Sequence, residues 1–271
     1  MIDAAITGAA GKMGKTLIAA LAESKVLNLT AAIEQPDQPS IGADAGELAG
    51  VGSNGVTITD DLKSACASFE VLIDFTIAAA TMENVAICQG ENRKMVIGTT
   101  GLSELERAGL ATAAKTIPIV HASNFSVGVN VTFKLAAIAA SILGNDADIE
   151  ITEAHHRYKV DAPSGTAITL GEVVAAQLDR KLADVAVYGR EGTGGQRKRK
   201  TIAFHSLRAG DIVGDHTVTF AGEGELIELT HRAQSRMNFA MGALRAAEFV
   251  SAQASGLFDM QDVLDLKSID G

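Results

Sequence analysis

The chain has 271 residues, of which 47% are hydrophobic and 21% charged, and its formal net charge at pH 7 is −10. This length suits two modest domains, and the acidic balance argues against a nucleic-acid partner, because phosphate binding needs a broad basic face. The longest apolar run, 131–143, is interrupted by Lys134 and is shorter than the roughly 20 residues that span a bilayer, which argues against a membrane partner.

The amino terminus does not resemble a targeting signal. It reads MIDAAITGAAGKMGK, with an acid at position 3 and a glycine cluster where a signal peptide has a basic start and an apolar core. Cys66 and Cys88 lie in apolar contexts without metal-ligand or CxxC spacing, so we interpret them as buried, reduced thiols. We therefore expect a cytoplasmic protein.

Residues 1–126 alternate short apolar runs with amphipathic stretches, a pattern typical of βαβ units in a mostly parallel sheet. We predict helices between the strands, for example over 105–115. The Gly- and Pro-rich segment 35–55 is expected to be a long surface loop with little regular structure. The predicted strands are 2–7, 27–34, 71–76, 95–100 and 117–123.

A glycine-rich turn joins the first predicted strand to the first helix. The segment ITGAAGKMGKTL contains Gly8, Gly11 and Gly14, with Ala10 where the common dinucleotide fingerprint has its second glycine. Such glycines let amides at the helix start approach a pyrophosphate. Glu34 closes the second strand 20 residues after Gly14, the distance at which an acid bonds the adenosine ribose. The order of strand, glycines, helix, strand and acid favours dinucleotide binding over a plain βα turn.

Two further polar segments, GTTG (98–101) and HASNFS (121–126), follow later predicted strands. Ligands of open parallel sheets bind at the carboxyl ends of the strands, so these segments suit a nicotinamide ribose and carboxamide. Ordinary turn chemistry is the alternative. With the glycine turn, they make a redox enzyme our leading interpretation.

The pattern changes from Val127 onward. An Ala-rich helix is followed by a strand at 148–156, a helix at 166–178 and strands at 201–207, 216–222 and 225–231, with antiparallel hairpins expected among the last three. A helix at 237–253 and a tail SGLFDMQDVLDL complete the chain. We predict an α/β protein: a Rossmann-like parallel-sheet domain over 1–126, with 236–271 returning to pack on it, and an α+β domain with a mixed or antiparallel sheet over 127–235.

The segment EAHHRYKVDAPSGTA, which starts at position 153, concentrates polar chemistry. Ile149 and Ile151 should point inward, so His155 and His156 should point to opposite sides if the strand persists. Ser164 is a predicted helix N-cap, which would leave the amides of Gly165 and Thr166 unpaired and ready to bind a carboxylate. With Lys159 and a histidine, this turn would bind a small acid beside proton donors. A single histidine, an exposed lysine or a helix cap is, taken alone, more often structural.

Other site chemistries fit this segment poorly. Adjacent histidines do not readily chelate one zinc ion and no third ligand has metal-site spacing, so we expect no metal. A Ser-His hydrolase would need a G-x-S-x-G turn around Ser164, and none is present. The run RKRK (197–200) leaves a nucleic-acid or phosphate contact open, with a solvated loop as the favoured interpretation.

Seven motifs together resemble the 4-hydroxy-tetrahydrodipicolinate reductases, long called dihydrodipicolinate reductases, of bacterial and plant lysine synthesis. They run through the whole chain: GAAGKMG, DFT, GTTG, ASNFSVGVN, EAHHRYKVDAPSGTA, RAGDIVGDHTV and SGLFDMQDVLDL. The resemblance implies hydride transfer from NAD(P)H to a cyclic imine dicarboxylate, giving tetrahydrodipicolinate. It also implies a homotetramer built through the sheet of the second domain.

The resemblance also assigns site residues. It implies catalytic roles for His155, as proton donor or acceptor, and for Lys159, as a second donor. The implied substrate-binding residues are His156, Ser164, Gly165 and Thr166. The implied cofactor-binding residues are Gly8, Ala9, Ala10, Gly11, Lys12, Met13, Glu34, Gly98, Thr99, Thr100, Ala122, Ser123, Asn124 and Phe125.

One departure from the family concerns the cofactor. Many bacterial members have an arginine after the ribose acid, where it can meet a 2′-phosphate, but here Gln35 follows Glu34. We therefore expect NADH to be used at least as well as NADPH. Two rival hypotheses stay open: a non-catalytic nucleotide-sensing protein, and another two-domain dehydrogenase that acts on sugars or polyols.

Overall fold

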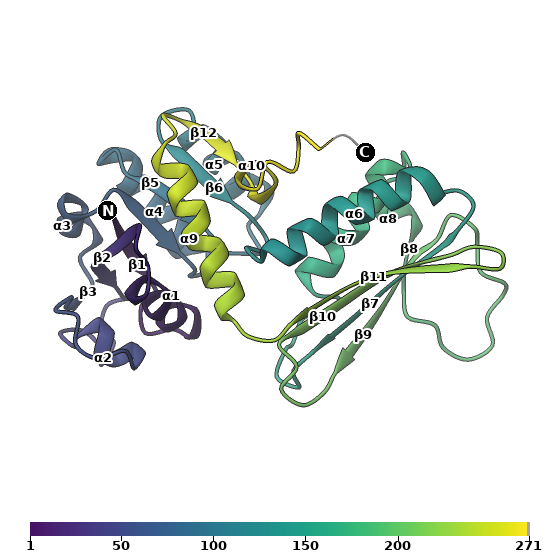
Figure 1. Ribbon diagram of the computed structural model, residues 1–271, viewed down its shortest axis with the longest axis horizontal. Helices are drawn as coiled ribbons and strands as arrows, with labels where there is room; N and C mark the ends of the chain where they lie inside the picture. Colours follow the sequence, from purple (N-terminus) through teal and green to yellow (C-terminus); the bar gives the residue numbers. More distant parts are fainter. Residues whose placement is uncertain (270–271) are drawn as a thin grey trace. The chain divides into compact units, whose positions relative to one another are not determined.

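Figure 1 shows a computed structural model of the chain, which describes residues 1–269. The chain forms two compact units, Met1–Val127 with Arg236–Ser268, and Gly128–Ser235. The boundaries expected after 126 and after 235 lie within one residue of these. In the predicted returning segment 236–271, Ile269 is grouped with the second unit, and residues 270 and 271 lie outside the described residues.

The first unit is built, within residues 1–269, on a seven-stranded sheet in the order β12-β6-β5-β4-β1-β2-β3, with parallel pairing throughout. Because β1 lies between β2 and β4, the direction of strand addition reverses there, which is where open parallel sheets bind ligands. This confirms the predicted Rossmann-like sheet. The strands are β1 (Ile2–Thr7), β2 (Leu27–Ile33), β3 (Ile58–Thr59), β4 (Val71–Asp74), β5 (Lys94–Ile97), β6 (Pro118–His121) and β12 (Gly256–Phe258).

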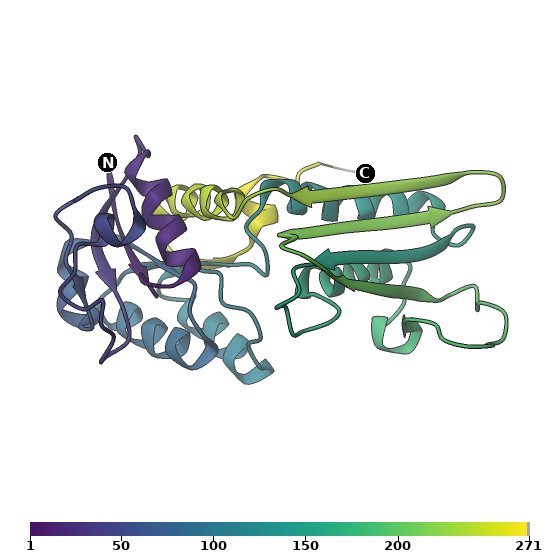
Figure 2. The same ribbon diagram turned by 90° about the horizontal axis from the view of Figure 1, so that it is seen from below.

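Helices cover both faces of this sheet (Figures 1 and 2), so its central strands are apolar on both sides. Ile6 and Ile73 pack in one core with α1 and α9, whereas Leu72 and Ile97 pack in the other with α4 and α5. Cys66 and Cys88 are free and buried, as predicted. The helices are α1 (Lys12–Ala22), α2 (Ala45–Ala49), α3 (Leu62–Ala65), α4 (Ala78–Gly90), α5 (Glu104–Ala113), α9 (Met237–Ser251) and α10 (Met260–Val263), with a 3₁₀ turn at Cys66–Ser68.

Several strand ends in this unit were predicted too late: the strands expected at 95–100 and 117–123 end at Ile97 and His121. The strand predicted at 71–76 ends at Asp74, because the Asp74 carboxylate accepts hydrogen bonds from the amide and hydroxyl of Thr76 and turns the chain. The segment 35–55 has little regular structure, as predicted, although it contains the short helix α2. Asp44 caps that helix through the Glu47 amide at 3.0 Å and also binds the Ser53 hydroxyl at 2.8 Å.

The described part of the second unit forms a five-stranded sheet in the order β11-β10-β7-β9-β8. β10 pairs antiparallel with β7 and β11, whereas β9 pairs parallel with β7 and β8, which confirms a mixed sheet. Helices α6 and α7 cover one face (Figure 1), where Ile149 and Ile151 are buried as predicted. The elements are α6 (Val127–Leu143), β7 (Asp148–His155), α7 (Gly165–Gln177), α8 (Leu182–Val185), β8 (Ala186–Tyr188), β9 (Ile202–Arg208), β10 (Gly214–Ala221) and β11 (Leu226–Ala233).

The hairpin expectation holds for β10 and β11 but not for β9. β7 lies between β9 and β10, so β9 is a parallel partner of β7 and forms no hairpin with β10. A turn-based argument could not foresee this, because it considers only strands that are adjacent in sequence.

The basic run 197–200 is not simply a solvated loop. The Arg197 side chain is 18% exposed and donates to Asp148 at 2.7 Å and to Glu150 at 2.9 Å. It also donates to backbone carbonyls of β7 and of its own loop, among them those of Ile149 and Thr201. Arg197 therefore ties this loop to the start of β7, a structural role that the sequence interpretation missed.

Candidate functional site

The glycine turn after β1 has the backbone geometry of a phosphate-binding turn. Gly8 has φ +71°, a conformation that favours glycine. A Cβ on Gly14 would lie 2.1 Å from the Gly8 carbonyl oxygen, so α1 packs against the turn only because that position has no side chain. Among residues 1–269, no side chain caps α1 at its N-cap, Gly11, so the first-turn amides can receive an anion.

Glu34 lies beside this turn. Its carboxylate accepts hydrogen bonds from the Ala10 amide and from the Gln35 amide, both at 2.9 Å. The turn predicted to bind the pyrophosphate and the acid predicted to bind the adenosine ribose are therefore adjacent. These residues fit a nicotinamide dinucleotide. In the same turn Ala9 is buried, Lys12 is exposed and Met13 packs partly against the core.

The segments that follow β4 and β5 are joined by hydrogen bonds to Thr99. The Thr99 hydroxyl accepts from the Thr76 amide at 3.1 Å and from the Thr81 hydroxyl at 2.8 Å. Thr99 is 3% exposed, so its side chain supports the loop, whereas Thr100 is exposed and Ala122 is half-buried.

Aromatic packing holds the same strand ends. A Cβ on Gly98 would lie 2.2 Å from the Phe75 ring, whose centroid is 5.4 Å from that of Phe125. Of the predicted residues that follow β6, Phe125 is buried, Asn124 is half-buried and Ser123 is exposed. The predicted cofactor residues thus lie at carboxyl ends of neighbouring strands of the first unit.

In the second unit, the buried face of β7 changes from apolar to polar along the strand. Ile149, Ile151, Glu153 and His155 alternate on that face. Glu153 is 1% exposed and His155 9% exposed. The strand ends at His155, so the expectation of opposite-facing histidines does not apply, because His156 already lies in the following turn.

Glu153 is surrounded by donors. Arg208 donates two hydrogen bonds to its two oxygens, each at 2.8 Å, the Ser164 amide donates at 3.2 Å, and Nδ1 of His155 lies 2.6 Å away. Burial works to raise the pKa of Glu153, but hydrogen bonds from Arg208 and His155 outweigh it and hold the pKa at about 2. The carboxylate is therefore ionised and accepts a hydrogen bond from the Nδ1–H group of His155.

His155 itself is largely neutral at pH 7. Burial lowers its pKa below the usual 6.5, and nearby Lys159 and Arg208 lower it further, while Glu153 opposes them. The Lys159 ammonium pairs with Asp161 at 2.8 Å, and Arg208 donates to the Asp161 carbonyl at 2.6 Å. The turn that carries Lys159 is thus fastened to the same arginine that holds Glu153.

Ser164 caps α7 as predicted. Its hydroxyl accepts from the Ala167 amide at 3.2 Å and lies 2.9 Å from Nε2 of His216. His216 is 4% exposed, and burial lowers its pKa to about 3, so its ring is neutral. Gly165, the first residue of α7, is exposed, and an added Cβ would meet no atom within 4 Å, whereas Thr166 is buried.

The sequence interpretation missed three residues of this cluster: Glu153, Arg208 and His216. The signal for Glu153 was present, because an acid at 153 shares the period-two face of Ile149 and Ile151. Arg208 and His216 come from β9 and β10, whose register with β7 was not predictable from spacing.

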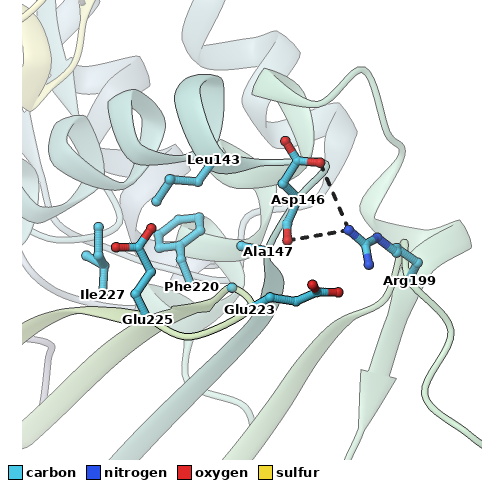
Figure 3. Close-up of a pocket in the computed structure, with 9 residues that line it drawn as sticks. Leu143, Asp146, Ala147, Arg199, Phe220, Glu223, Glu225 and Ile227 are labelled. Carbon is cyan, nitrogen blue, oxygen red and sulfur yellow. Dashed lines mark hydrogen bonds and ion pairs between the residues drawn. The ribbon is translucent and has the colours of Figure 1, made fainter.

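A cavity of about 310 Å³ lies elsewhere in the second unit (Figure 3), beyond the amino end of β7, with an ion pair between Asp146 and Arg199 in its wall. Its lining includes none of the predicted site residues. Within residues 1–269, no group of three or more His, Cys, Asp or Glu side chains is placed to hold a metal ion. In the same range, no helix is both long and apolar enough to cross a membrane.

Both units match known family models. Residues 2–125 match the model described as dihydrodipicolinate reductase, N-terminus, and residues 128–264 match dihydrodipicolinate reductase, C-terminus. The chain belongs to the dihydrodipicolinate reductase family. This family consists of NAD(P)H-dependent oxidoreductases, which agrees with the glycine turn and Glu34.

Individual relatives agree with this assignment. The chain is 57% identical over 263 residues to 4-hydroxy-tetrahydrodipicolinate reductase of Saccharophagus degradans, covering 97% of this chain and 98% of the relative. A solved structure, dipicolinate-bound dihydrodipicolinate reductase from Paenisporosarcina sp. TG-14, has a TM-score of 0.76 at 25% identity and covers 97% and 98% of the two chains.

More distant structures share the fold alone. A myo-inositol 2-dehydrogenase from Lactobacillus plantarum has a TM-score of 0.60 at 12% identity and covers 92% of this chain and 88% of its own. A polyol dehydrogenase therefore has the same fold as this chain. The family models and the 57% identical relative, in contrast, point to a dihydrodipicolinate reductase.

Proposed function

We propose that this protein reduces 4-hydroxy-tetrahydrodipicolinate, or the dihydrodipicolinate ring formed from it by loss of water, to tetrahydrodipicolinate in the diaminopimelate route to lysine. The observation that carries the proposal is the cluster at the carboxyl end of β7. It combines a buried histidine, a lysine and the start of α7 in one unit of a chain whose other unit has a dinucleotide-binding turn. We propose the first unit as the cofactor domain and the second as the substrate and oligomerisation domain.

The start of α7 is proposed to hold the substrate carboxylates. Amides in the first turn of a helix have no partner within the helix, and the helix dipole favours an anion there. Gly165 is exposed with open space above its Cα, so a carboxylate can approach closely. The proposed binding residues are His156, Ser164, Gly165 and Thr166, with Ser164 acting as the cap that keeps the turn in place.

His155 and Lys159 are proposed to supply protons. His155 has its Nδ1 occupied by Glu153, so Nε2 is the nitrogen that can exchange a proton with the ring. The partly exposed Lys159 ammonium can leave Asp161 for a substrate anion, because an exposed ion pair contributes only ~1 kcal/mol or less. A cation near the imine polarises it for reduction.

Bound NAD(P)H supplies the hydride. The residues proposed to hold it lie at the carboxyl ends of strands β1, β2, β5 and β6: Gly8, Ala9, Ala10, Gly11, Lys12, Met13, Glu34, Gly98, Thr99, Thr100, Ala122, Ser123, Asn124 and Phe125. We propose that NADH is used at least as well as NADPH, since the Glu34 carboxylate accepts from ribose hydroxyls and repels a 2′-phosphate. A catalytic efficiency more than about tenfold higher with NADPH than with NADH would contradict this.

The assembly is proposed to be a homotetramer in the cytoplasm. Leu207 and Leu226 are 54% and 56% exposed, and in the strand register they are the partners of Ala154 and Ala221, on the sheet face away from α6 and α7. Such exposed apolar side chains favour a protein contact. Sedimentation equilibrium tests the tetramer, and cell fractionation tests the location.

A coupled assay tests the reaction. Aspartate semialdehyde, pyruvate and the preceding synthase would generate the substrate, and consumption of NADH would be followed when this protein is added. Competition by dipicolinate separates a dicarboxylate reductase from a dehydrogenase of neutral sugars or polyols. A protein that binds NADH but oxidises none in this assay would instead be a nucleotide sensor.

A further inference from the structure

We infer that Glu153 is a positioning residue: its carboxylate fixes the tautomer and orientation of His155 and couples that histidine to the start of α7. The inference rests on the proposed function, because it gives Glu153 its importance through the proton that His155 delivers. It concerns a buried acid that does not itself contact the substrate. Three observations carry it.

The first observation is the contact between the two side chains. Nδ1 of His155 lies 2.6 Å from a carboxylate oxygen of Glu153, and both residues are buried. An ionised carboxylate can only accept, so Nδ1 carries the proton and donates it. Nε2 is then the nitrogen left for proton exchange, and one ring orientation is selected.

The second observation is the space beside Nε2. A Cβ placed on Gly214 of β10 would lie 3.0 Å from Nε2 of His155, tighter than ordinary contact. The glycine therefore leaves room beside this nitrogen, whereas the other nitrogen is in contact with Glu153. The two ring nitrogens of His155 have different surroundings, as a directional proton donor requires.

The third observation is that Glu153 joins three segments. One oxygen accepts from the Ser164 amide at the start of α7, at 3.2 Å. Arg208 bridges both oxygens and also donates to the Asp161 carbonyl in the turn after β7. A single carboxylate thus sets the histidine relative to the turn that is proposed to receive the substrate.

The electrostatic consequence is a change in the pKa of His155. The titratable and charged groups that face it are Glu153 on β7, Arg208 on β9, His216 on β10 and Lys159 in the turn. The hydrogen bond to the Glu153 carboxylate and its charge raise the pKa of His155, whereas burial, Lys159 and Arg208 lower it, so the pKa falls when the carboxylate is replaced. The midpoint of the pH–rate limb that reports His155 therefore moves to lower pH, whether His155 acts as acid or base.

A matched control lies three residues away on the same strand. Glu150 is also held by arginines and a histidine, namely Arg190, Arg197 and His205, and its pKa is also about 2. It lies on the opposite face of β7, and the hydrogen bonds of its carboxylate come from Arg190, Arg197 and His205, which lie outside the His155 cluster. Glu150→Gln therefore removes an equivalent charge and network without touching the site.

The experiment compares Glu153→Gln with Glu150→Gln in the full chain. Nitrogen-15 spectra of labelled histidine report the tautomer of His155, whose signals are assigned by their loss in His155→Asn. We expect the Nδ1–H tautomer to dominate in the unaltered protein and in Glu150→Gln, and to lose that dominance in Glu153→Gln. The turnover number of Glu153→Gln should fall at least ~10-fold, with the pH midpoint lower by roughly half a unit or more.

An unchanged His155 tautomer or pH midpoint in Glu153→Gln would overturn the inference. Glu153→Asp is a second variant that can be used if Glu153→Gln does not fold, because it keeps the negative charge. The pH midpoint of its rate should stay near that of the unaltered protein, while its shorter side chain lowers turnover. Unaltered turnover in Glu153→Asp would also count against the inference. The tautomer measurement needs neither substrate nor cofactor, so it tests Glu153 even if the coupled assay shows no reductase activity.

Discussion

The carboxylate of Glu34 accepts a hydrogen bond from the backbone amide of Ala10 at 2.9 Å, although the two residues are 24 positions apart. This contact places an anion at the edge of the glycine turn, directly after β2, the strand that neighbours β1. The Gln35 amide binds the other oxygen, so the acid is oriented from both sides. A nucleotide bound here would meet the Glu34 carboxylate, and the adjoining residue, Gln35, has no positive charge to offset it.

Gln35→Arg should therefore shift the cofactor preference toward NADPH. An arginine at this exposed position can pair with a 2′-phosphate and offset repulsion by Glu34. We expect the ratio of catalytic efficiencies, NADPH over NADH, to rise by roughly 10-fold or more. Steady-state kinetics with both nucleotides measure it. Gln89→Arg, on α4 of the same unit, adds the same charge elsewhere and should leave the ratio unchanged. Equal ratios in the two variants would refute the proposal that Glu34 and residue 35 face the adenosine ribose.

Gly165→Leu tests the start of α7 as an anion site. Because an added Cβ meets nothing within 4 Å, the fold should tolerate the substitution, while the side chain obstructs the approach to the helix amides. We expect the Michaelis constant for the dicarboxylate to rise about 10-fold or more, with NADH affinity barely changed. Gly194→Leu, also in open space in the second unit, is the control. Equal losses of both affinities would show that the turn is only structural.

Lys159→Ala separates binding from chemistry. If Lys159 feeds a proton to the ring, turnover at saturating dicarboxylate should fall at least ~100-fold, within the range of a lost general acid. Circular dichroism and NADH affinity should stay near those of the unaltered protein, because the partly exposed pair with Asp161 adds little stability. Lys198→Ala removes an exposed lysine of the same unit as a control. Normal turnover with weakened substrate affinity would reduce Lys159 to an electrostatic anchor.

Glu150→Gln should destabilise the second unit in a pH-dependent way. Burial tends to raise the pKa of Glu150, but hydrogen bonds from Arg190 and His205 lower it from 4.5 to about 2. A carboxyl with a lowered pKa stabilises the fold above its unfolded pKa, and this contribution is lost as pH falls toward the folded value. The shift corresponds to at most ~3 kcal/mol, part of which solvent screens.

Urea unfolding followed by circular dichroism, repeated between pH 7 and pH 2, measures this contribution. We expect Glu150→Gln to be less stable than the unaltered protein by about 2 kcal/mol at pH 7, and the difference to vanish as the pH falls from about 5 toward 2. A difference that is constant across this range would show that packing, and not the charge of Glu150, is responsible.

Much of the fold was predictable because local patterns agree with the tertiary outcome. The apolar runs at 2–7 and 148–156 became β1 and β7 within a residue, and Ser164 caps α7 where the motif placed it. The errors occur where a side chain outside the local pattern acts on the chain. Asp74 ends β4 early by binding Thr76. Asp44 supports the short helix α2 in a segment that otherwise has little regular structure, as predicted.

The sequence by itself determined the two-domain α/β architecture, the glycine turn with its acid, and the residues that the family resemblance assigns to the site. The architecture and the glycine turn depend on periodicity, turn chemistry and spacing, which are properties of neighbouring positions along the chain. The site residues follow from the resemblance of the motifs to those of the family. Only the tertiary structure decided that Arg208 and His216 stand beside Glu153 and His155. Strand order and register set those contacts, and β9 and β10 flank β7 because their buried faces complete one core beneath α6 and α7.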